Sequence, residues 1–485
     1  MKRMKVLSVL SIVVMLCLSV LPVTAQGPDP GKGNTDIYAM NMDGSATAGG
    51  SVQYINPAGG VDATKPLSIA PLGSQEFTAA SSGVGDGWLG SAVVWADKEV
   101  AANVNAVWTD GYSKKDGITA GAYTGYSAGS DTMYLPFVVF NPNIQFTRFS
   151  VQNTATDTAS ITMTYLNRDG VQDFQFTDSI PAQAQKTYDM STTGAKIPTW
   201  TSSSYYNSNG NWTGAVVVTA NKPIVAVASN HWREWAVIYN GSGSGSTKTF
   251  VPSVERRYVV QGGIQKWRGF SVIAIQNLSS ATTASVTLHY INAFTGLEDL
   301  TIGPETINPQ AAKGFNTKSG GDVDKTLYNV LGDAWVGSVI IDSTVDVAVI
   351  AYSIRPTSKM AGSTLGVTSA VAGTKTFLPM AYQKKSGSTW VRWSLLRIQN
   401  PGTTTASDVD IYFKNRDGTT AASLLNQTIA GEKSMNWNTK NHEAQIPLGG
   451  NWEGGVYIEA DQPLVAVMET LDGVYWMSAY NGVSK

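Results

Sequence analysis

One stretch of this chain reads Trp212-Thr213-Gly214-Ala215-Val216-Val217-Val218, followed by Asn221-Lys222-Pro223 and a second apolar run over residues 224–227. Two β-branched runs on either side of a short polar break are typical of a β-hairpin. The Trp-x-Gly start recurs at Trp88, Trp335 and Trp452, and the four copies are 124, 123 and 117 residues apart. A period of that length is a small domain and not a solenoid unit of about 20–50 residues. The sequence therefore predicts a string of four similar domains.

The first 25 residues have the features of an export signal. Basic residues precede an apolar run over residues 6–21, and Val23-Thr24-Ala25 supplies a small-residue cleavage site. The run is short for a membrane-spanning helix, and no second apolar segment of sufficient length follows it. The single cysteine, Cys17, lies inside this signal. We therefore expect cleavage after Ala25 and a secreted chain with no disulfide bond, no lipid anchor and no membrane span.

The composition excludes some classes of function. Charged residues make up only 14% of the chain and the net charge is −2, which argues against nucleic acid as a partner because nucleic acid requires a basic face. The chain has 48 glycines, yet 42% of its residues are hydrophobic and 14 are tryptophan. This composition indicates turn-rich extracellular β-structure with filled cores, and not a disordered chain.

Each repeat carries the same landmarks in the same order. A strand ending in Asn comes first, at Asn153 in repeat two, and an alternating strand follows with Ile161, Met163 and Tyr165 on one face. The strand ends in an Asp-Gly turn, which is a strong hairpin signal. An Ile and an aromatic residue eight positions later, Ile180 and Tyr188, indicate a tight turn between two further strands. About seven short strands per repeat predict an antiparallel sandwich.

The landmarks divide the chain into a signal and four repeats. Gly/Ser-rich stretches such as residues 241–246 are predicted to be flexible linkers between them. The predicted segments are 1–25 (signal peptide), 26–131 (repeat one), 132–247 (repeat two), 248–374 (repeat three) and 375–485 (repeat four).

Repeats two to four begin with a lead strand that repeat one lacks. The lead strands contain Leu135-Pro136, Val251-Pro252 and Leu378-Pro379, whereas only the Gly/Pro-rich residues 26–36 precede the first strand of repeat one. We expect an open sheet edge along residues 37–41 that takes a strand or loop from a partner chain. The alternative, slightly favoured, is a six-stranded first domain whose edge residues 26–36 cover.

Taken together, these motifs resemble tandem Ig-like repeat proteins of bacterial cell surfaces. The resemblance rests on the Leu-Pro lead, the Asn-Arg-Asp-Gly turn over residues 167–170, the Trp-x-Gly-Ala-Val-Val run and the closing Tyr-Asn-Gly at residues 239–241, and it covers roughly residues 37–482. It implies an all-β chain of four tandem antiparallel β-sandwich domains of the Ig-like type after a cleaved signal peptide. It implies an extracellular location, and it says little about a ligand.

The sequence offers no pattern of catalytic residues. The three histidines, His231, His289 and His442, do not recur at matching repeat positions and do not have metal-ligand spacing. A cysteine nucleophile, a G-x-S-x-G elbow and a phosphate-binding glycine loop are all missing from the mature sequence. We therefore expect no enzyme activity, no cofactor and no metal.

Candidate binding residues are found where the repeats differ. If the strands alternate direction, the Asp-Gly turn, the variable loop before Trp-x-Gly and the end of the last strand share one end of the sandwich. Aromatic rings beside amide and carboxylate groups suit saccharide recognition, although packing at domain junctions is the favoured interpretation. The candidate ligand-binding residues are Asn167, Arg168, Asp169, Trp200, Tyr205, Tyr206, Trp232, Trp235, Arg416, Asp417 and Trp476. The repeated tryptophans, which we predict to be structural, are Trp88, Trp212, Trp335 and Trp452.

The sequence thus predicts a secreted, non-catalytic protein of the cell surface or extracellular matrix with a structural or adhesive role. The alternative is a secreted carbohydrate-binding protein that uses loop aromatics. A weaker alternative is an accessory module of an extracellular hydrolase system. The expected partners are other cell-surface proteins or copies of the same chain, with polysaccharide as a further candidate.

Overall fold

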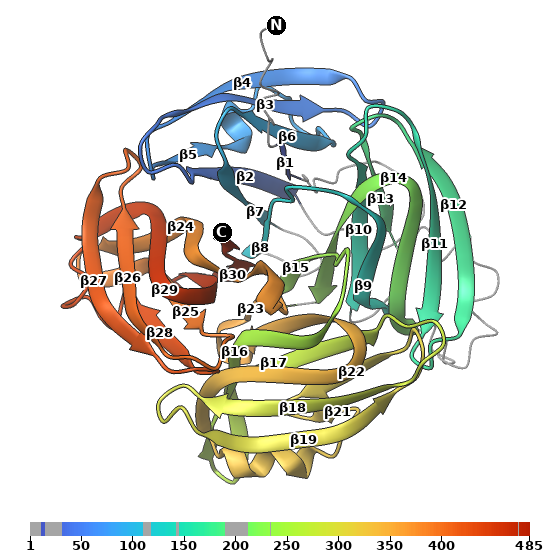
Figure 1. The fold of residues 1–485 in the computed structure, drawn as a ribbon, viewed down its shortest axis with the longest axis vertical. Helices are drawn as coiled ribbons and strands as arrows, with labels where there is room; N and C mark the ends of the chain where they lie inside the picture. Colours follow the sequence, from blue (N-terminus) through green and yellow to red (C-terminus); the bar gives the residue numbers. More distant parts are fainter. Residues whose placement is uncertain are drawn as a thin grey trace, which may run out of the picture.

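The four repeats form a closed ring. The computed structural model describes residues 11–14, 32–109, 118–141, 145–189, 212–232, 234–473 and 475–485. About 69% of the described residues are in strands and 4% in helices, which confirms the predicted all-β class. Figure 1 shows the repeats in chain order around a common centre, so that repeat four returns to repeat one. The chain is therefore a ring, although the sequence suggested an open string of domains.

Repeat one contains two antiparallel sheets. Its elements are β1 (Ser11–Val14), β2 (Lys32–Asn41), β3 (Ala48–Ile55), β4 (Val61–Ile69), β5 (Ser74–Phe77), η1 (Ala79–Ser81), β6 (Ser91–Ala96), β7 (Val100–Thr109) and β8 (Ile118–Thr124). The sheets have the orders β1-β6-β3-β4 and β5-β2-β7-β8.

In repeat two one long strand links all the others into a continuous antiparallel network. The elements are β9 (Ser130–Asn141), β10 (Gln145–Asn153), β11 (Ala159–Asn167), β12 (Gln172–Ile180), β13 (Gln185–Asp189), β14 (Trp212–Trp232) and β15 (Ala236–Asn240). Their order is β12-β11-β14-β9-β10-β13, with β15 also paired to β14.

Repeats three and four follow the plan of repeat two with small additions. The elements of repeat three are β16 (Ser246–Gln261), β17 (Ile264–Asn277), β18 (Ala284–Asn292), β19 (Glu298–Ile307), β20 (Ala312–Asn316), β21 (Gly320–Gly321), η4 (Lys325–Leu331), β22 (Ala334–Arg355), η5 (Pro356–Ser358), β23 (Met360–Leu365) and η6 (Ser369–Val371). Those of repeat four are β24 (Gly373–Ser386), β25 (Thr389–Gln399), β26 (Ala406–Lys414), β27 (Thr420–Ile429), β28 (Ser434–Asn438), β29 (Asn451–Asp472), β30 (Trp476–Asn481) and β31 (Val483–Ser484).

The two apolar runs after Trp-x-Gly do not form a hairpin, so that prediction is wrong. In repeat two they form one long strand, β14, whose first half pairs with β9 and β11 and whose second half pairs with β10 and β15. The polar break Asn221-Lys222-Pro223 lies where the strand passes from one set of partners to the other, and strands that switch sheets commonly bend at such a point. Since each run pairs with different strands, the two runs never pair with each other.

The Asn at the end of the second strand is hydrogen-bonded to the Ile that precedes the tight turn. The Nδ2 of Asn153 donates to the carbonyls of Asp157 at 2.7 Å and Ile180 at 3.1 Å. Asn41, Asn277 and Asn400 make the same pair of bonds in the other repeats. A buried amide that satisfies two loop carbonyls stabilises the connection without burying unpaired polar groups.

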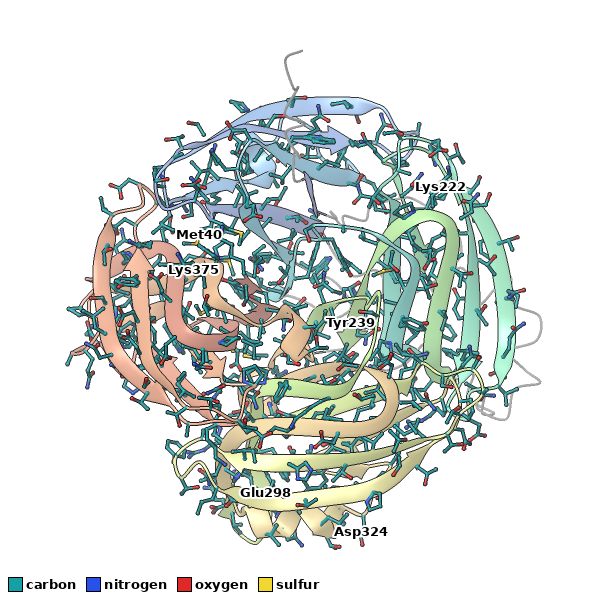
Figure 2. The ribbon with its side chains drawn as sticks, viewed as in Figure 1. Met40, Lys222, Tyr239, Glu298, Asp324 and Lys375 are labelled. Atoms are coloured by element: carbon teal, nitrogen blue, oxygen red, sulfur yellow. The ribbon has the colours of Figure 1, made fainter. Side chains whose placement is uncertain are left out.

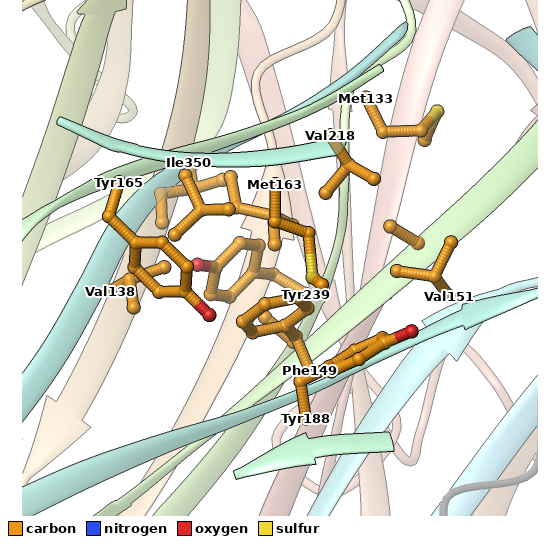
Figure 3. Packing of buried hydrophobic residues seen from close by; sticks show 14 of the residues in the cluster. Met133, Val138, Phe149, Val151, Met163, Tyr165, Tyr188, Val218, Tyr239 and Ile350 are labelled. Atoms are coloured by element: carbon orange, nitrogen blue, oxygen red, sulfur yellow. The ribbon is translucent and has the colours of Figure 1, made fainter. Parts of the chain in front are cut away.

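The Trp-x-Gly motif forms the end of each core. Trp212 is fully buried, and its Nε1 donates to Asp173 Oδ2 at 2.8 Å. A Cβ added to Gly214 would stand 2.1 Å from the Leu166 carbonyl and 2.7 Å from the Trp212 ring, so no other residue fits there. Trp335 and Trp452 are also buried and Trp88 is half-buried. Figure 3 shows the core of repeat two, in which Phe149 lies between Tyr165 and Tyr188.

The closing strands of the four repeats meet at the centre of the ring. These strands are β8, β15, β23 and β30, and each contacts its neighbours around the ring. Asn240 Nδ2 donates to the Thr124 carbonyl at 2.8 Å, and Asn481 Nδ2 donates to the Leu365 carbonyl at 3.0 Å. In Figure 2 the labelled Tyr239 lies near this centre, whereas Lys222 and Asp324 lie toward the rim. We call these four strands the hub.

The predicted flexible linkers are hydrogen-bonded to the ring. Gly241 N donates to the Ala226 carbonyl at 2.7 Å, and Ser242 N donates to the Tyr134 carbonyl at 3.0 Å. The linker after repeat two therefore continues the sheet edge, and the prediction of flexibility is wrong for residues 241–242. Its glycines serve close packing instead, since a Cβ on Gly245 would stand 2.9 Å from that of Asp346.

Candidate functional site

The Asn-Arg-Asp-Gly turn of repeat two is internally bonded. Asn167 is buried, and its Nδ2 donates to Asp173 Oδ1 at 2.9 Å. The Asn167 Oδ1 in turn accepts from Asp169 N at 3.0 Å. Asp173 also accepts the Trp212 indole bond. Asn167 and Asp169 thus belong to a network that orients the turn and the core tryptophan.

The same turn docks on repeat three. Arg168 forms an ion pair with Asp322. A Cβ on Gly170 would stand 2.0 Å from the carbonyl oxygen of Pro309 in the tight turn of repeat three. Backbones that approach so closely leave no space for a ligand. The candidates Asn167, Arg168 and Asp169 therefore lie at the junction between repeats two and three.

The corresponding turn of repeat four closes the ring on repeat one. Arg416 pairs with Glu76 at 2.6 Å and with Glu453 at 2.5 Å. A Cβ on Gly418 would stand 2.1 Å from the carbonyl oxygen of Pro71. Because Glu76 and Pro71 belong to repeat one, the candidate Arg416 joins the two ends of the ring.

Asp417 and Trp476 lie apart from each other. Asp417 is at the exposed tip of the turn, where its Oδ1 accepts from Thr419 N at 3.0 Å. Trp476 is buried, and the guanidinium of Arg392 lies 5.0 Å from its ring centroid. Arg392 also forms an ion pair with Asp472 at 2.6 Å. This arginine, which lies between Trp390 and Trp393 in the sequence, is therefore a stacked structural cation.

The aromatic candidates of repeat two that are described pack against repeat three. The ring of Trp232 lies 6.3 Å from that of Trp235 and 6.1 Å from that of Tyr352. Tyr352 belongs to β22 of repeat three, so Trp232 is a junction residue. Trp200, Tyr205 and Tyr206 lie outside the described residues.

A chain of buried charges at the junction between repeats three and four was not found from the sequence. Arg355 bridges two carboxylates, with Nε 3.2 Å from Glu255 Oε1 and Nη2 2.9 Å from Glu469 Oε2. Arg397 Nε lies 3.2 Å from the other Glu469 oxygen, and Arg257 pairs with Glu255 at 2.6 Å. We call these five residues the charged junction. No repeated motif marks them, because each occurs in only one repeat.

The arginines of the charged junction favour the ionised form of Glu469. Burial raises the pKa of Glu469, but Arg397 and Arg355 outweigh burial and lower the pKa to about 2. Burial lowers the pKa of Arg355, but Glu255 and Glu469 outweigh it and raise the pKa. Alternating signs and hydrogen-bonded geometry are the conditions under which buried charges are tolerated. These residues are therefore an interface element and do not resemble an acid–base pair with separated pKa values.

The lead hairpins of repeats three and four carry aromatic rings covered by cations. Tyr258 and Trp267 lie 4.9 Å apart, with Arg256 about 5 Å from both rings. In repeat four Lys385 lies 4.4 Å from the Trp390 ring centroid. All three rings are half-buried, and the hairpin tips expose apolar side chains. We call these rings and their cations the hairpin surfaces. In the sequence, each of these hairpins carries an arginine between aromatic residues, as in Trp267-Arg268-Gly269-Phe270, and this pattern could have pointed to the hairpin surfaces.

The histidines do not converge on a site. His231 is buried between the rings of Trp108 and Phe146, each 4.9 Å away, and its Nε2 lies 3.0 Å from Ser229 Oγ. Burial, followed by Arg148, lowers the pKa of His231 to about 3. Over the described ranges, no three His, Cys, Asp or Glu side chains are grouped as a metal site would require. No helix among the described residues has the length and apolarity needed to cross a membrane.

Comparisons with known proteins leave the family open. No family model matches the chain, and no curated protein matches it. Among solved structures, Thermotoga maritima 1070 is similar at 21% identity over 24% of this chain and 96% of its own, with a TM-score of 0.20. The Anabaena sensory rhodopsin transducer is similar at 15% identity over 20% of this chain and 88% of its own, with a TM-score of 0.18. A mutant of the major pilin from Streptococcus pyogenes is similar at 9% identity over 73% of this chain and 99% of its own, with a TM-score of 0.13. Similarity at this level carries no argument about function.

Proposed function

We propose that this chain is a secreted, non-catalytic protein that acts as a rigid structural or adhesive unit of the bacterial cell exterior. One observation carries the proposal: the four repeats are held to one another by contacts that close a ring. Turns, lead strands and hub strands all make contacts between repeats. A ring without disulfides in its mature sequence is stabilised by these interfaces, which suits a durable extracellular component.

The export signal supports the location. The basic start, the apolar run over residues 6–21 and the cleavage site at Ala25 are features of a secreted chain. Candidate partners are other surface proteins or further copies of the ring. The surfaces of the described residues that are open to a partner suit binding, and we propose no catalytic role for them.

The test compares the intact ring with an opened one. A Gly418→Val chain places a side chain against the Pro71 carbonyl at a backbone angle, φ of 84°, that suits glycine, so it should open the junction between repeats four and one. We expect the wild-type ring to be exported and to bind isolated cell envelopes, and the variant to lose most of that binding. Gly85→Val, at a site with open space, is the matched control. A cytoplasmic wild-type chain, or one that does not bind envelopes, would contradict the proposal.

Carbohydrate binding is the second candidate, and the hairpin surfaces favour it. Half-buried aromatic rings beside Arg256, Lys385 and Lys440 suit the apolar faces and acidic groups of an anionic polysaccharide. On a glycan array we expect selectivity for acidic saccharides that Trp390→Ala reduces at least tenfold. Trp232→Ala, in a junction away from the hairpins, is the control. Equal binding to neutral and acidic glycans would argue against this function.

A further inference from the structure

The lead strands of repeats two to four occupy one equivalent place. Each runs antiparallel beside the first half of the long strand in its own repeat. The aliphatic residue before proline always pairs with the second residue after the glycine of Trp-x-Gly. The pairs are Leu135 with Val216, Val251 with Val339 and Leu378 with Val456.

In repeat one, this place is occupied by a segment of the export signal. We call the export signal, residues 1–25, the leader. The strand β1 (Ser11–Val14) pairs antiparallel with β6, and Val14 lies opposite Ala92, the second residue after Gly90. The register therefore matches that of the lead strands. The other edge of β6 pairs with β3, and no other described strand pairs with the edge that β1 covers. The open edge expected along residues 37–41 is not there, because β2 pairs with β5 and β7.

Without β1 the edge of β6 would be suited to accept a strand. The residues Ser91–Ala96 include neither a charge nor a proline, and Ala92, Val93 and Val94 are buried. Exposed edges in stable proteins are usually blunted by charges, proline or bulges, because unpaired backbone groups recruit another strand. None of these protections is present along β6.

The lead strands also build the ring. β9 packs on β22 of repeat three, β16 on β29 of repeat four, and β24 on β7 of repeat one. Phe137 of β9, for example, lies 5.9 Å from the Tyr352 ring. By the same arrangement, a strand that continues past the β6 edge would reach the junction between repeats one and two. Filling this edge therefore completes a sheet and a junction together.

The leader matches the register but not the sequence pattern of the lead strands. All three lead strands read aromatic–aliphatic–proline: Tyr134-Leu135-Pro136, Phe250-Val251-Pro252 and Phe377-Leu378-Pro379. The corresponding leader residues are Val13-Val14-Met15. The leader strand is also only four residues long, whereas β9 has 12 and β24 has 14. Because β1 is shorter than the lead strands and has no aromatic residue, we expect that a better-matched strand can replace it beside β6.

We propose that the β6 edge of repeat one is a strand-acceptor site. Ser11–Val14 occupies it in the full-length chain. Once the leader is removed after Ala25, the edge takes an extended segment of a partner chain that carries the aromatic–aliphatic–proline pattern and adds antiparallel to β6. The inference rests on the proposed secretion only for the step that removes the leader, and purified chains test the site whether or not secretion occurs.

The binding experiment compares the chain over residues 26–485 with the full-length chain. The probe is a labelled peptide of residues 130–141, and the control peptide carries Tyr134→Asp and Leu135→Asp. We expect the leader-free chain to bind one probe per ring and the control at least tenfold more weakly. The full-length chain should bind the probe more weakly than the leader-free chain, because its site is filled. Hydrogen exchange at those amides of residues 91–96 that do not bond to β3 should be fast in the leader-free chain and slow once the probe is bound.

A self-complemented variant separates folding from binding. Full-length chain with Val13→Tyr, Val14→Leu and Met15→Pro should melt higher than wild type and bind no probe. Association of leader-free chains that the probe disrupts would identify a second copy as the natural donor and support the site. Slow exchange, in the leader-free chain without probe, at the amides of residues 91–96 that face away from β3 would overturn the proposal. Equal binding of probe and control peptides would also overturn it.

Discussion

Two junctions of the ring share a backbone arrangement and differ in chemistry. At the junction between repeats two and three, the lead strand places Phe137 against Tyr352, and the apolar core of repeat two continues into repeat three through Ile350 and Phe270. At the junction between repeats three and four, the lead strand places Ser253 against Glu469 in the equivalent position. The main apolar core of repeat three contains only its own residues, and the charged junction takes over at its border.

This difference shows that the fold of each repeat and the sequence in which the repeats follow one another around the ring depend on different interactions. The sheets and turns are repeated, so any repeat could in principle pack on any other. A buried aromatic face cannot dock on a buried row of charges without leaving those charges unpaired, and an unpaired buried charge is costly. The junction chemistry therefore specifies which repeat follows which around the ring. Four predictions test this comparison.

The largest effect is expected at Glu469. Glu469→Ala leaves Arg355 and Arg397 buried without their shared carboxylate. The loss of a buried partner should lower the free energy of unfolding by about 3–5 kcal/mol, measured by urea denaturation. Glu459→Ala on the same strand is the control, since its pair with Lys375 is largely exposed. If both variants unfold at the same urea concentration, the charged junction does not stabilise the ring.

Acid should weaken the charged junction and the packing of His231 between Trp108 of repeat one and Phe146 of repeat two in different pH windows. The folded-state pKa of His231, about 3, lies below its ordinary 6.5, so below pH 6.5 protons bind the unfolded chain first and stability falls. This group contributes a slope of about 1.4 kcal/mol per pH unit. The folded-state pKa of Glu469, about 2, lies below its ordinary 4.5, so its contribution is present above pH 4.5 and is lost toward pH 2.

Substitution of His231 identifies its part in the loss of stability below pH 6.5. His231→Gln should remove its share of the slope between pH 6.5 and about 3, and the loss of stability that Glu469 causes as the pH falls from 4.5 toward 2 should remain. Urea denaturation at half-unit pH steps measures both. An unchanged upper slope in the variant would show that His231 titrates normally in the folded ring.

The aromatic junction should respond moderately to the loss of one hydroxyl. Tyr352→Phe removes the acceptor of a 3.0 Å bond from Asn230 Nδ2, in a buried site. The expected cost is about 1–3 kcal/mol, with little dependence on salt, measured by thermal melting at two salt concentrations. Tyr412→Phe, whose hydroxyl bonds to Asp410 near the surface, should cost less. A cost as large as that of Glu469→Ala would remove the contrast between the junctions.

The smallest effect is expected at the rim. Arg168 and Asp322 are both partly exposed, so their ion pair should contribute only about 0–1 kcal/mol, decreasing with salt. Arg168→Ala should therefore shift the melting temperature slightly and lose even that shift in about 1 M salt. Lys222→Ala, which removes another exposed pair within one repeat, is the control. A large decrease in melting temperature for Arg168→Ala would mean that the turn contact contributes more to the stability of the junction than the lead strand does.

Sequence patterns correctly predicted the features of this protein that depend on contacts between residues close together in the chain. The alternation of Ile161, Met163 and Tyr165 gave a correct buried face, and the Trp-x-Gly spacing identified a core position where only glycine fits. The sequence placed Arg168 and Arg416 among candidate ligands or junction residues, and both lie at junctions. The prediction of a hairpin after Trp-x-Gly failed because the alternation within a strand does not reveal which sheet its neighbours belong to.

The sequence by itself determined that the chain is all-β with four similar units, and it located the alternating strand, the Asp-Gly turn and the buried Trp-x-Gly position of repeat two, because these features depend on contacts that a repeat makes within itself. Only the tertiary structure decided that the repeats close into a ring, that the leader segment lies beside β6 and that Glu255, Arg355 and Glu469 meet. Those contacts join residues that occur once and lie far apart in the chain. They follow from the curvature of the sheets and from ring closure. Neither of these can be predicted from the repeated motifs of the sequence.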